Sequence, residues 1–393
     1  FKERKMISSK YTIREQNEAQ ILNQIIKHRE ISRAELSKIT SLNKASVSSI
    51  TNKLINDGFI IEKRIGEATN RGRKPIMLTF NGSSSALVIA IDLGYNYIDG
   101  ALASLDGKEI HRVQLIDTYV NKKNVQDLIH KVFNQLTSDC PHTHYGIVGM
   151  TIALQGQVLN NKIISTSYND LAEINLVEML NQEYNFPVFL QNEANLSALG
   201  EYTFSSDIEN LASISLHSGI GVGLVKNGKL DVGNKGYAGQ LGHTILFPNG
   251  RKCTCGNHGC LEKYCSTQVI YHEISKEKNL NKINSDVVSI LYNNKESKVV
   301  KMIEQYAYYL SIGVNNAIML YAPELVIFNS PLTKKIPDII NIIQRNLNNQ
   351  FTKDVLVINS PIEWNPVISG AISLSIQKFL NIEQLKLGKL NKI

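Results

Sequence analysis

HTILFPNGRKCTCGNHGCLE, residues 243–262, is the stretch of this chain that most restricts its fold. It contains four soft donors of the type that holds a tetrahedral zinc ion: His243, Cys253, Cys255 and Cys260. Gly256 and Gly259 allow so short a loop to turn around an ion without backbone strain. A disulfide from Cys260 to either other cysteine, or free thiols, are the alternatives. We expect zinc in a structural role, because four protein ligands leave no open coordination position for a water molecule.

The overall composition is compatible with a large intracellular protein. The chain has 393 residues, enough for two or three domains around a sizeable core. Its five cysteines are not spaced as a small secreted framework, which favours a reducing compartment. No run of about 18 apolar residues occurs, and the first residues lack the apolar segment of a signal peptide. We therefore expect a cytoplasmic protein that does not enter a membrane.

The net charge of +7 is concentrated at one end of the chain. Residues 1–80 contain 16 Lys and Arg against 8 Asp and Glu, whereas the remaining residues contain 26 against 27. A positive segment ahead of a nearly neutral body is typical of a module that binds a polyanion such as DNA. Charge alone is also compatible with an ordinary solvated surface.

The basic segment has the pattern of a helix-turn-helix. Apolar residues recur on one face of a first helix over 18–29. Ser32 and Glu35 have the spacing of a capping box at the start of a second helix. A third helix over 44–57 follows a tight turn, and Gly58 closes it. Three helices of these lengths predict a DNA-binding domain of this class.

The third helix and the loop after it have the composition of a DNA-contacting surface. The outer face of the helix is polar or cationic and has no acid before Asp57, so it can approach phosphates closely. The runs 59–63 and 75–78 predict the strands of a wing, whose loop RGRKP suits a narrow minor groove. The candidate DNA contacts are Ser32, Arg33, Lys44, Ala45, Ser46, Ser48, Ser49, Asn52, Lys53, Arg71, Arg73 and Lys74. A small helical protein-interaction domain is the alternative.

From residue 87 onward, short apolar runs alternate with longer helical patterns, which predicts an α/β body. After a first hairpin that turns at Asp106-Gly107, we expect strands at 146–153, 188–190, 211–216 and 325–328. Helices are expected near 124–137, 173–184, 195–203, 298–321 and 335–348. The Lys- and Asn-rich residues 276–300 are expected to form an exposed connection. No internal repeat is visible, although two α/β lobes can share a fold without sequence similarity.

Four motifs in the body resemble the ROK family of repressors, open reading frames and sugar kinases. They are NEAN (192–195), SGIGVG (218–223), GQLGH (239–243) and CTCGNHGCLE (253–262). With the basic segment included, the chain is most similar to the xylose-repressor branch of that family. The resemblance implies an N-terminal winged helix-turn-helix (α+β), followed by an α/β body of two actin-like or ribonuclease-H-like lobes with a sugar in the cleft between them. The expected domains are residues 1–82, a first lobe of 83–195 with the C-terminal helix in 366–393 returning to it, and a second lobe of 196–365.

The family includes kinases, and this chain departs from their pattern at three places. Glu193 stands where family kinases have the Asp that deprotonates the sugar hydroxyl. Tyr95 and Asn96 stand where the first phosphate turn has Gly and Thr, and His217 begins the second glycine turn. Each lost positioning group reduces the rate of transfer strongly. We therefore predict no catalytic residues and no phosphoryl transfer.

By the same resemblance, the sugar contacts are Gln155, Gly156, Asn192, Glu193, Gln240, His243 and Glu262. Gln240 replaces a family acid, and Gln155 replaces a proline, so the identity of the sugar is open between xylose, which we prefer, and another monosaccharide. A purely bracing role is the alternative for each residue. Neutral ligands such as sugars are held by mixtures of this kind, of carboxylates, amides and backbone groups.

These observations predict a sugar-responsive transcriptional repressor. Its expected partners are double-stranded operator DNA with a palindromic sequence, a monosaccharide effector and a second copy of the chain in a homodimer. An ATP-dependent sugar kinase and a sugar-binding scaffold without DNA function are the two alternatives. Structural zinc is the one expected cofactor.

Overall fold

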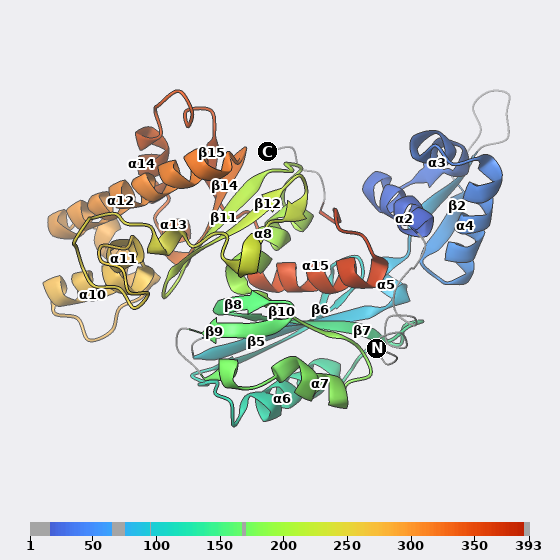
Figure 1. The fold of residues 1–393 in the computed structure, drawn as a ribbon, viewed down its shortest axis with the longest axis horizontal. Helices are drawn as coiled ribbons and strands as arrows, with labels where there is room; N and C mark the ends of the chain where they lie inside the picture. The colour runs from blue at the N-terminus through green and yellow to red at the C-terminus, as the bar shows by residue number, and fades with distance from the viewer. Residues whose placement is uncertain (1–15, 65–74, 95, 167–169, 389–393) are drawn as a thin grey trace. The chain divides into compact units, whose positions relative to one another are not determined.

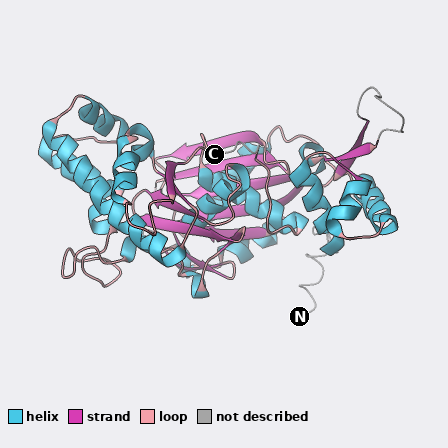
Figure 2. Ribbon diagram, turned by 90° about the horizontal axis from the view of Figure 1, so that it is seen from above, coloured by secondary structure: helices cyan, strands magenta, loops and turns pink. Residues whose placement is uncertain are grey.

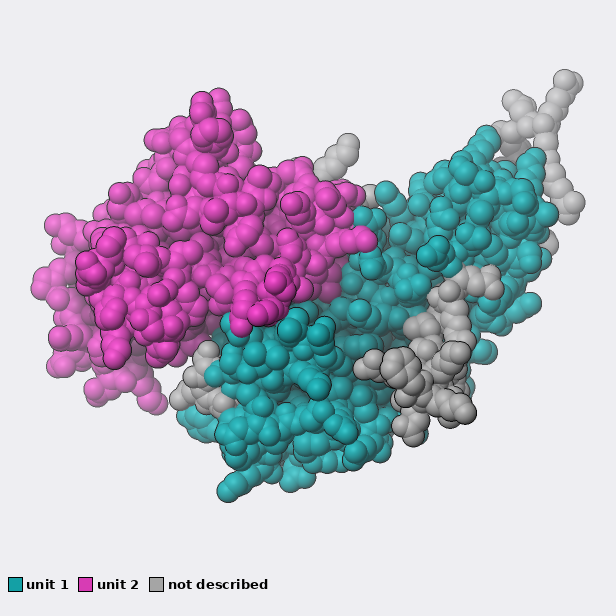
Figure 3. All heavy atoms as spheres, viewed as in Figure 1, with its two compact units in different colours: residues 1–196, 367–391, 393 teal, residues 197–366, 392 magenta. Residues whose placement is uncertain are grey.

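The computed structural model describes residues 16–64, 75–94, 96–166 and 170–388. The chain divides into two compact units, which Figure 3 shows in two colours. Unit 1 consists of residues 1–196 and 367–391, and unit 2 of residues 197–366. Among the described helices, none combines the length and apolar character needed to span a bilayer.

Unit 1 begins with a winged helix-turn-helix. Its elements are α2 (Gln16–His28), β1 (Ile31–Ser32), α3 (Arg33–Thr40), α4 (Lys44–Asn56), β2 (Ile60–Arg64) and β3 (Ile76–Phe80). The strands form an antiparallel sheet in the order β1-β3-β2, with the three helices beside it (Figure 1). The predicted wing loop, with Arg71, Arg73 and Lys74, lies outside the described residues.

Local sequence signals determine where these helices begin and end. Ser32 and Glu35 form the predicted capping box of α3, in which each side chain bonds the backbone N–H of the other residue. The side chain of Asn43 caps α4 by accepting from the N–H of Ser46 at 2.8 Å. Gly58 follows α4 with φ +75°, a left-handed conformation that favours glycine. Leu22 and Leu54 from the apolar faces are buried in the core of this domain.

The rest of unit 1 is built around a five-stranded mixed sheet. The strands are β4 (Leu87–Leu93), β5 (Tyr97–Ser104), β6 (Glu109–Ile116), β7 (Ile147–Leu154) and β10 (Val188–Asn192), in the order β10-β7-β4-β5-β6. β4, β5 and β6 are antiparallel, whereas β7 and β10 run parallel to β4. The predicted strands at 146–153 and 188–190 correspond to β7 and β10.

Helices cover both faces of this sheet (Figure 1). α6 (Val125–Thr137) and α7 (Leu176–Glu183) pack on one face through Val132 and Leu180, which belong to the same apolar core as the strands. α15 (Pro366–Leu380) lies on the other face, where Ser375 hydrogen-bonds Thr151 of β7 at 2.7 Å. The smaller elements of unit 1 are α5 (Gly82–Ser85), β8 (Gly156–Leu159), β9 (Lys162–Thr166) and η1 (Leu171–Glu173). α8 (Glu193–Phe204) carries the chain into unit 2.

Unit 2 has a sheet of the same design. Its strands are β11 (Leu211–Leu216), β12 (Ile220–Lys226), β13 (Lys229–Leu230), β14 (Leu325–Asn329) and β15 (Leu356–Asn359), in the order β13-β12-β11-β14-β15. Again the first three strands are antiparallel, and the last two run parallel to the central one. The two sheets therefore share one topology, although the sequence shows no repeat.

The helices of unit 2 include the one predicted over 298–321, whereas those at 262–265, 267–278, 285–293 and 331–335 were not predicted. The helices are α9 (Glu262–Cys265), α10 (Thr267–Lys278), α11 (Ser285–Asn293), α12 (Ser297–Tyr321), α13 (Pro331–Lys335) and α14 (Asp338–Asn346), with short turns η2 (Asn234–Gly236) and η3 (Leu241–His243). The expectation of a loop over 276–300 is wrong, because α11 lies there and buries Val288 in the core. The helix predicted over 335–348 is α14, which begins three residues later than predicted, at Asp338; Pro337 separates it from α13, because proline lacks the N–H that a helix interior requires. Figure 2 distinguishes the helices (cyan) of the chain from its strands (magenta).

Candidate metal centre, sugar-binding residues and DNA-binding surface

The loop between η3 and α9 brings the four predicted metal ligands together. Two isolated antiparallel bridges, Ile245 with Cys260 and Lys252 with His258, fold the loop back on itself. Gly259 has φ +81°, and a Cβ at this position would lie 1.6 Å from the carbonyl oxygen of Phe247. Only glycine permits this turn, so the backbone of the loop depends on its sequence.

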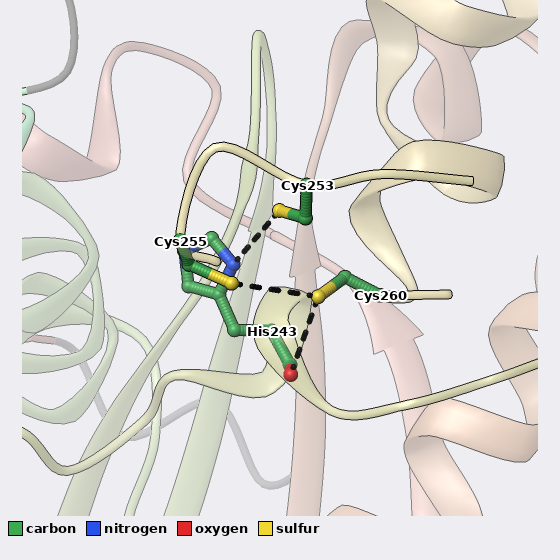
Figure 4. A group of neighbouring side chains, drawn as sticks. All are labelled: His243, Cys253, Cys255 and Cys260. Carbon is green, nitrogen blue, oxygen red and sulfur yellow. Dashed lines mark hydrogen bonds between the residues drawn. The ribbon is translucent and has the colours of Figure 1, made fainter. Parts of the chain in front are cut away.

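The four ligand atoms lie within 4.8 Å of one another. Cys253 Sγ lies 3.6 Å from His243 Nδ1, and Cys255 Sγ lies 3.6 Å from Cys260 Sγ (Figure 4). Zn–S bonds of about 2.3 Å place the sulfurs of a tetrahedral site about 3.8 Å apart. The arrangement fits a metal ion of this size, and the cysteines are free thiols and not a disulfide.

The pKa values of the cysteines affect how these residues could bind a cation. Burial raises the pKa of Cys253, and it raises the pKa of Cys260 to about 12. A hydrogen bond from the backbone N–H of Asn257 lowers the pKa of Cys255. Burying further thiolate charges beside the first is unfavourable, whereas a divalent cation supplies the compensating charge. Binding of a metal ion at these thiols would therefore release protons.

Two predicted sugar ligands, Glu262 and His243, lie together in unit 2, and His243 is also one of the candidate metal ligands. Cys253 Sγ donates to Glu262 Oε1 at 3.3 Å, and the same carboxylate oxygen lies 3.8 Å from His243 Nδ1. Glu262 also lines a cavity of about 450 Å³ together with Ser218 and Lys263. Gln240 is exposed in the turn before η3, where its carbonyl accepts from the N–H of His243 at 3.1 Å. Glu262 and His243 therefore lie close together, whereas the exposed side chain of Gln240 is not held beside them.

The other predicted sugar ligands meet at one edge of the unit 1 sheet. β7 and β10 are parallel neighbours, so their carboxyl ends, which carry Gln155 and Asn192, lie side by side. Gln155 Nε2 donates to Glu193 Oε1 at 2.9 Å. Asn192 Nδ2 donates to the carbonyl of Gly156 at 2.8 Å, while its Oδ1 accepts from the N–H of Ala194. Asn192 therefore also braces the start of α8. A bracing role of this kind is the alternative to sugar binding that the sequence left open for Asn192.

A buried pair of carboxyl groups lies at the same edge. Burial and the neighbouring Asp92 raise the pKa of Glu193 to about 8. Tyr97 donates its hydroxyl to Asp92 Oδ2 at 3.0 Å. The ring of Tyr97 also covers Gly94, since a Cβ there would lie 2.1 Å from the ring. Tyr97 is a contact that the sequence analysis missed, and Tyr95 lies outside the described residues.

α4 presents a polar stripe at helical spacing. Ala45, Ser49, Asn52 and Asn56 are exposed and lie at intervals of three or four residues, which places them on one face. Asn56 was not among the predicted contacts, although this periodicity points to it. Lys44 is exposed at the first turn, and Ser46 and Ser48 are half-buried.

Three predicted DNA contacts are engaged within the domain. The hydroxyl of Ser32 donates to Glu35 Oε2 at 2.7 Å in the capping box. Lys53 forms an ion pair with Glu18 of α2. The guanidinium of Arg33 bonds residues of α4 and β2. For these side chains, a contact with DNA would compete with an internal contact.

Family models match both parts of the chain. The ROK family matches residues 88–378, and a winged helix-turn-helix DNA-binding domain matches residues 14–61. The chain therefore belongs to the ROK family. The attached DNA-binding domain places it among the sugar-responsive transcriptional repressors of that family, as the following relatives show.

Two relatives that resemble nearly the whole chain are named as repressors. The xylose repressor of Bacillus subtilis (strain 168) is 30% identical over 388 residues, covering 96% of this chain and 99% of that protein. The N-acetylglucosamine repressor of Escherichia coli O6:H1 is 24% identical, covering 94% of each chain.

Solved structures confirm the fold. A ROK family transcriptional regulator, a homolog of the E. coli MLC protein, has a TM-score of 0.79 and 25% identity over 94% of this chain and 98% of its own. A ROK family glucokinase from Streptomyces griseus, in complex with glucose and AMPPNP, has a TM-score of 0.67 and 20% identity over 74% of this chain and 99% of its own. The share of this chain that the glucokinase covers corresponds in length to the ROK match over residues 88–378.

Proposed function

We propose that this repressor binds a palindromic operator as a homodimer and leaves it when a monosaccharide, preferably xylose, binds the body. The observation that carries the proposal is the winged helix-turn-helix joined to a ROK body. A pair of recognition helices would enter successive major grooves. The sugar must bind the DNA-incompetent state more tightly, because equal affinity for both states shifts no equilibrium.

The stripe on α4 supports its assignment as the recognition helix. Ser49 and Asn52 are exposed and carry the donors and acceptors that read base edges. Lys44, at the exposed first turn, is suited to a phosphate. We include Asn56 among the candidate base contacts because it continues the same face.

The polar groups in each unit support the effector assignment. In unit 1, Gln155 and Glu193 form a hydrogen-bonded pair next to Asn192. In unit 2, Glu262 lies beside His243, which is also one of the candidate metal ligands. Both sets mix carboxyl groups with neutral donors, as sugar hydroxyls require. The preference for xylose rests on the whole-length relatives that bear that name.

We propose zinc as the metal in the cysteine loop, with His243, Cys253, Cys255 and Cys260 as its ligands. When bound, zinc would compensate the thiolate charge and hold the loop rigid. Four protein ligands make its role structural. Elemental analysis of protein purified without chelators should find about one zinc per chain, and an absence of zinc would refute this assignment.

We also propose that the protein does not transfer phosphate. The ring of Tyr97 covers Gly94, where a phosphate-binding turn needs an accessible backbone. Glu193 holds a proton at neutral pH, because its pKa is about 8, and is therefore poorly suited as a general base. Nucleotide turnover above background with any pentose or hexose would favour the kinase alternative.

The central experiment is a mobility shift with promoter DNA containing A·T-rich palindromes and a panel of monosaccharides. We expect a shift that decreases with salt concentration, because phosphate contacts release counterions, and that xylose reverses. Failure to bind any DNA would refute the repressor. Binding that xylose does not reverse, but another sugar does, would correct only the effector.

A further inference from the structure

Arg33 is the first residue of α3, and its guanidinium connects three elements of the winged helix-turn-helix. Nε donates to Thr51 Oγ1 at 2.9 Å, and one terminal nitrogen donates to Asn52 Oδ1 at 3.1 Å. The other terminal nitrogen lies 2.7 Å from Glu62 Oε1 on β2. Each of the three nitrogens thus has its own partner, two on α4 and one on the wing strand.

The partners are themselves held in place. Thr51 is buried, and its hydroxyl donates to the carbonyl of Ser48 at 3.2 Å while it accepts from Arg33. Glu62 lies in β2, which is paired with β3 along its length. A planar guanidinium bound at three points has little rotational freedom left. It is therefore a rigid support for whatever else it bonds.

The contact with Asn52 determines which way the amide of this residue faces. A guanidinium has only donors, so the atom of Asn52 that faces Arg33 must be the carbonyl oxygen. The amide nitrogen Nδ2 then points away from Arg33. Within the described part of the chain, no residue hydrogen-bonds this nitrogen, and Asn52 is exposed on the face of α4.

We propose that Arg33 is a positioning residue for base recognition, which aims Nδ2 of Asn52 as a fixed donor at a base edge. The inference rests on the proposed role of α4 as the recognition helix. In the major groove the acceptors are N7 of purines, O6 of guanine and O4 of thymine, whereas cytosine presents a donor. The oriented amide selects a base with an acceptor at that position and disfavours cytosine.

This role differs from the direct phosphate contact that the sequence suggested for Arg33. Its positive charge is already opposed by Glu62, and its side chain is only 26% exposed. A phosphate contact would weaken binding to all sequences equally and lower the salt slope when removed. A positioning role changes the preference at one base and leaves the salt slope intact.

The test is selection from a randomised duplex DNA pool by the full-length protein, followed by sequencing and by salt titration of the selected site. Arg33→Lys keeps the charge but loses the forked geometry. We expect it to reduce the preference at one position of each half-site by about tenfold, with other positions and the salt slope unchanged. Asn52→Ala should abolish the preference at that same position.

A double-mutant cycle separates action through Asn52 from direct action. In the Asn52→Ala background, Arg33→Lys should have no further effect on base preference. Lys44→Ala is the contrasting variant, which should lower the salt slope by about two, because a dimer loses one phosphate contact in each half-site, and weaken all sites equally. An unchanged preference in Arg33→Lys, or a lower salt slope with a uniform loss, would overturn the inference.

Two controls keep the outcomes distinct. Thermal unfolding of each variant detects loss of fold, and Glu62→Gln provides a milder change that loosens the guanidinium without touching α4. It should reduce the preference at the same position, and no change there would count against the inference. If the wild type enriches no sequence at all, the assignment of α4 as a recognition helix fails and this inference fails with it.

Discussion

Two glycines in the loop that carries the candidate metal ligands differ in how much space a side chain would have. Gly256 and Gly259 both have positive φ, +97° and +81°. A Cβ at Gly259 would collide with the backbone of Phe247, whereas a Cβ at Gly256 would meet nothing within 4 Å. The two glycines of one motif therefore offer a matched pair of substitutions.

Gly259→Ala should abolish or strongly reduce metal binding. The loop must move to relieve the collision, and this movement separates Cys260 from the other ligands. Gly256→Ala should retain the metal and cost about 1 kcal/mol, from backbone strain alone. Zinc content and thermal unfolding of both variants measure the difference, and equal effects would show that the collision is not what matters.

Glu193 makes folding stability depend on pH. Its pKa of about 8 lies above the ordinary value of 4.5, so the folded state holds a proton that the unfolded state releases. The folded state binds more protons between these values, and stability falls as pH rises through that range.

Glu193→Gln should remove most of this pH dependence. Glutamine resembles the protonated acid, so the variant should exceed the wild type in stability by the order of a few kcal/mol at pH 8 and match it near pH 4. Thermal unfolding between pH 4 and 8 provides the measurement. Parallel curves for the two proteins would contradict the assignment of the raised pKa to Glu193.

At the scale of elements, side-chain caps fix where α3 and α4 of the winged helix-turn-helix begin. Asn43 caps α4 by accepting a hydrogen bond from the N–H of Ser46. The first turn of α4 has no acidic residue, and the positive charge of Lys44 is unfavourable beside the positive end of the helix dipole. The cap therefore affects the start of the proposed recognition helix.

Asn43→Ala should destabilise the DNA-binding domain by about 1 kcal/mol and weaken operator binding. Asn43→Asp keeps an acceptor at the cap and should preserve the fold. Amide hydrogen exchange in the first turn of α4 gives the local readout. If the alanine variant exchanges no faster there, the cap is not what holds this turn.

Some elements follow directly from the sequence and others do not. The capping box at Ser32 and the glycine after α4 are local signals, and both are confirmed. α11 was missed because its surroundings are rich in Lys and Asn, which are typical of loops. The burial of Val288 in the core of unit 2 stabilises this helix, and such a contact with distant elements leaves no local mark.

At the scale of the whole molecule, the chain combines two sheets of the same topology with one DNA-binding domain. A repressor of this design responds to its sugar only through a difference in affinity between states. The coupling between sugar and operator is therefore reciprocal.

The effector should bind the operator-bound protein more weakly than the free protein, by the same factor by which it weakens operator binding. For an inducer this factor is about 5–150. Calorimetric titration of xylose into protein with and without operator, compared with operator titrations with and without xylose, tests the equality. Unequal factors would show that a further species, such as a change in oligomeric state, takes part.

The candidate metal ligands, the helix-turn-helix and the family could all be predicted from the sequence, because each depends on spacing within a short segment. The four ligands of the loop occupy 18 residues, and their proximity follows from the turn that Gly259 permits. The sequence did not predict that Glu193 lies beside Asp92, that Tyr97 covers Gly94, or that Arg33 faces α4 and β2; the fold is needed to show these contacts. Those side chains are placed by the pairing of strands and the packing of helices, and their roles depend on neighbours that the sequence order does not reveal.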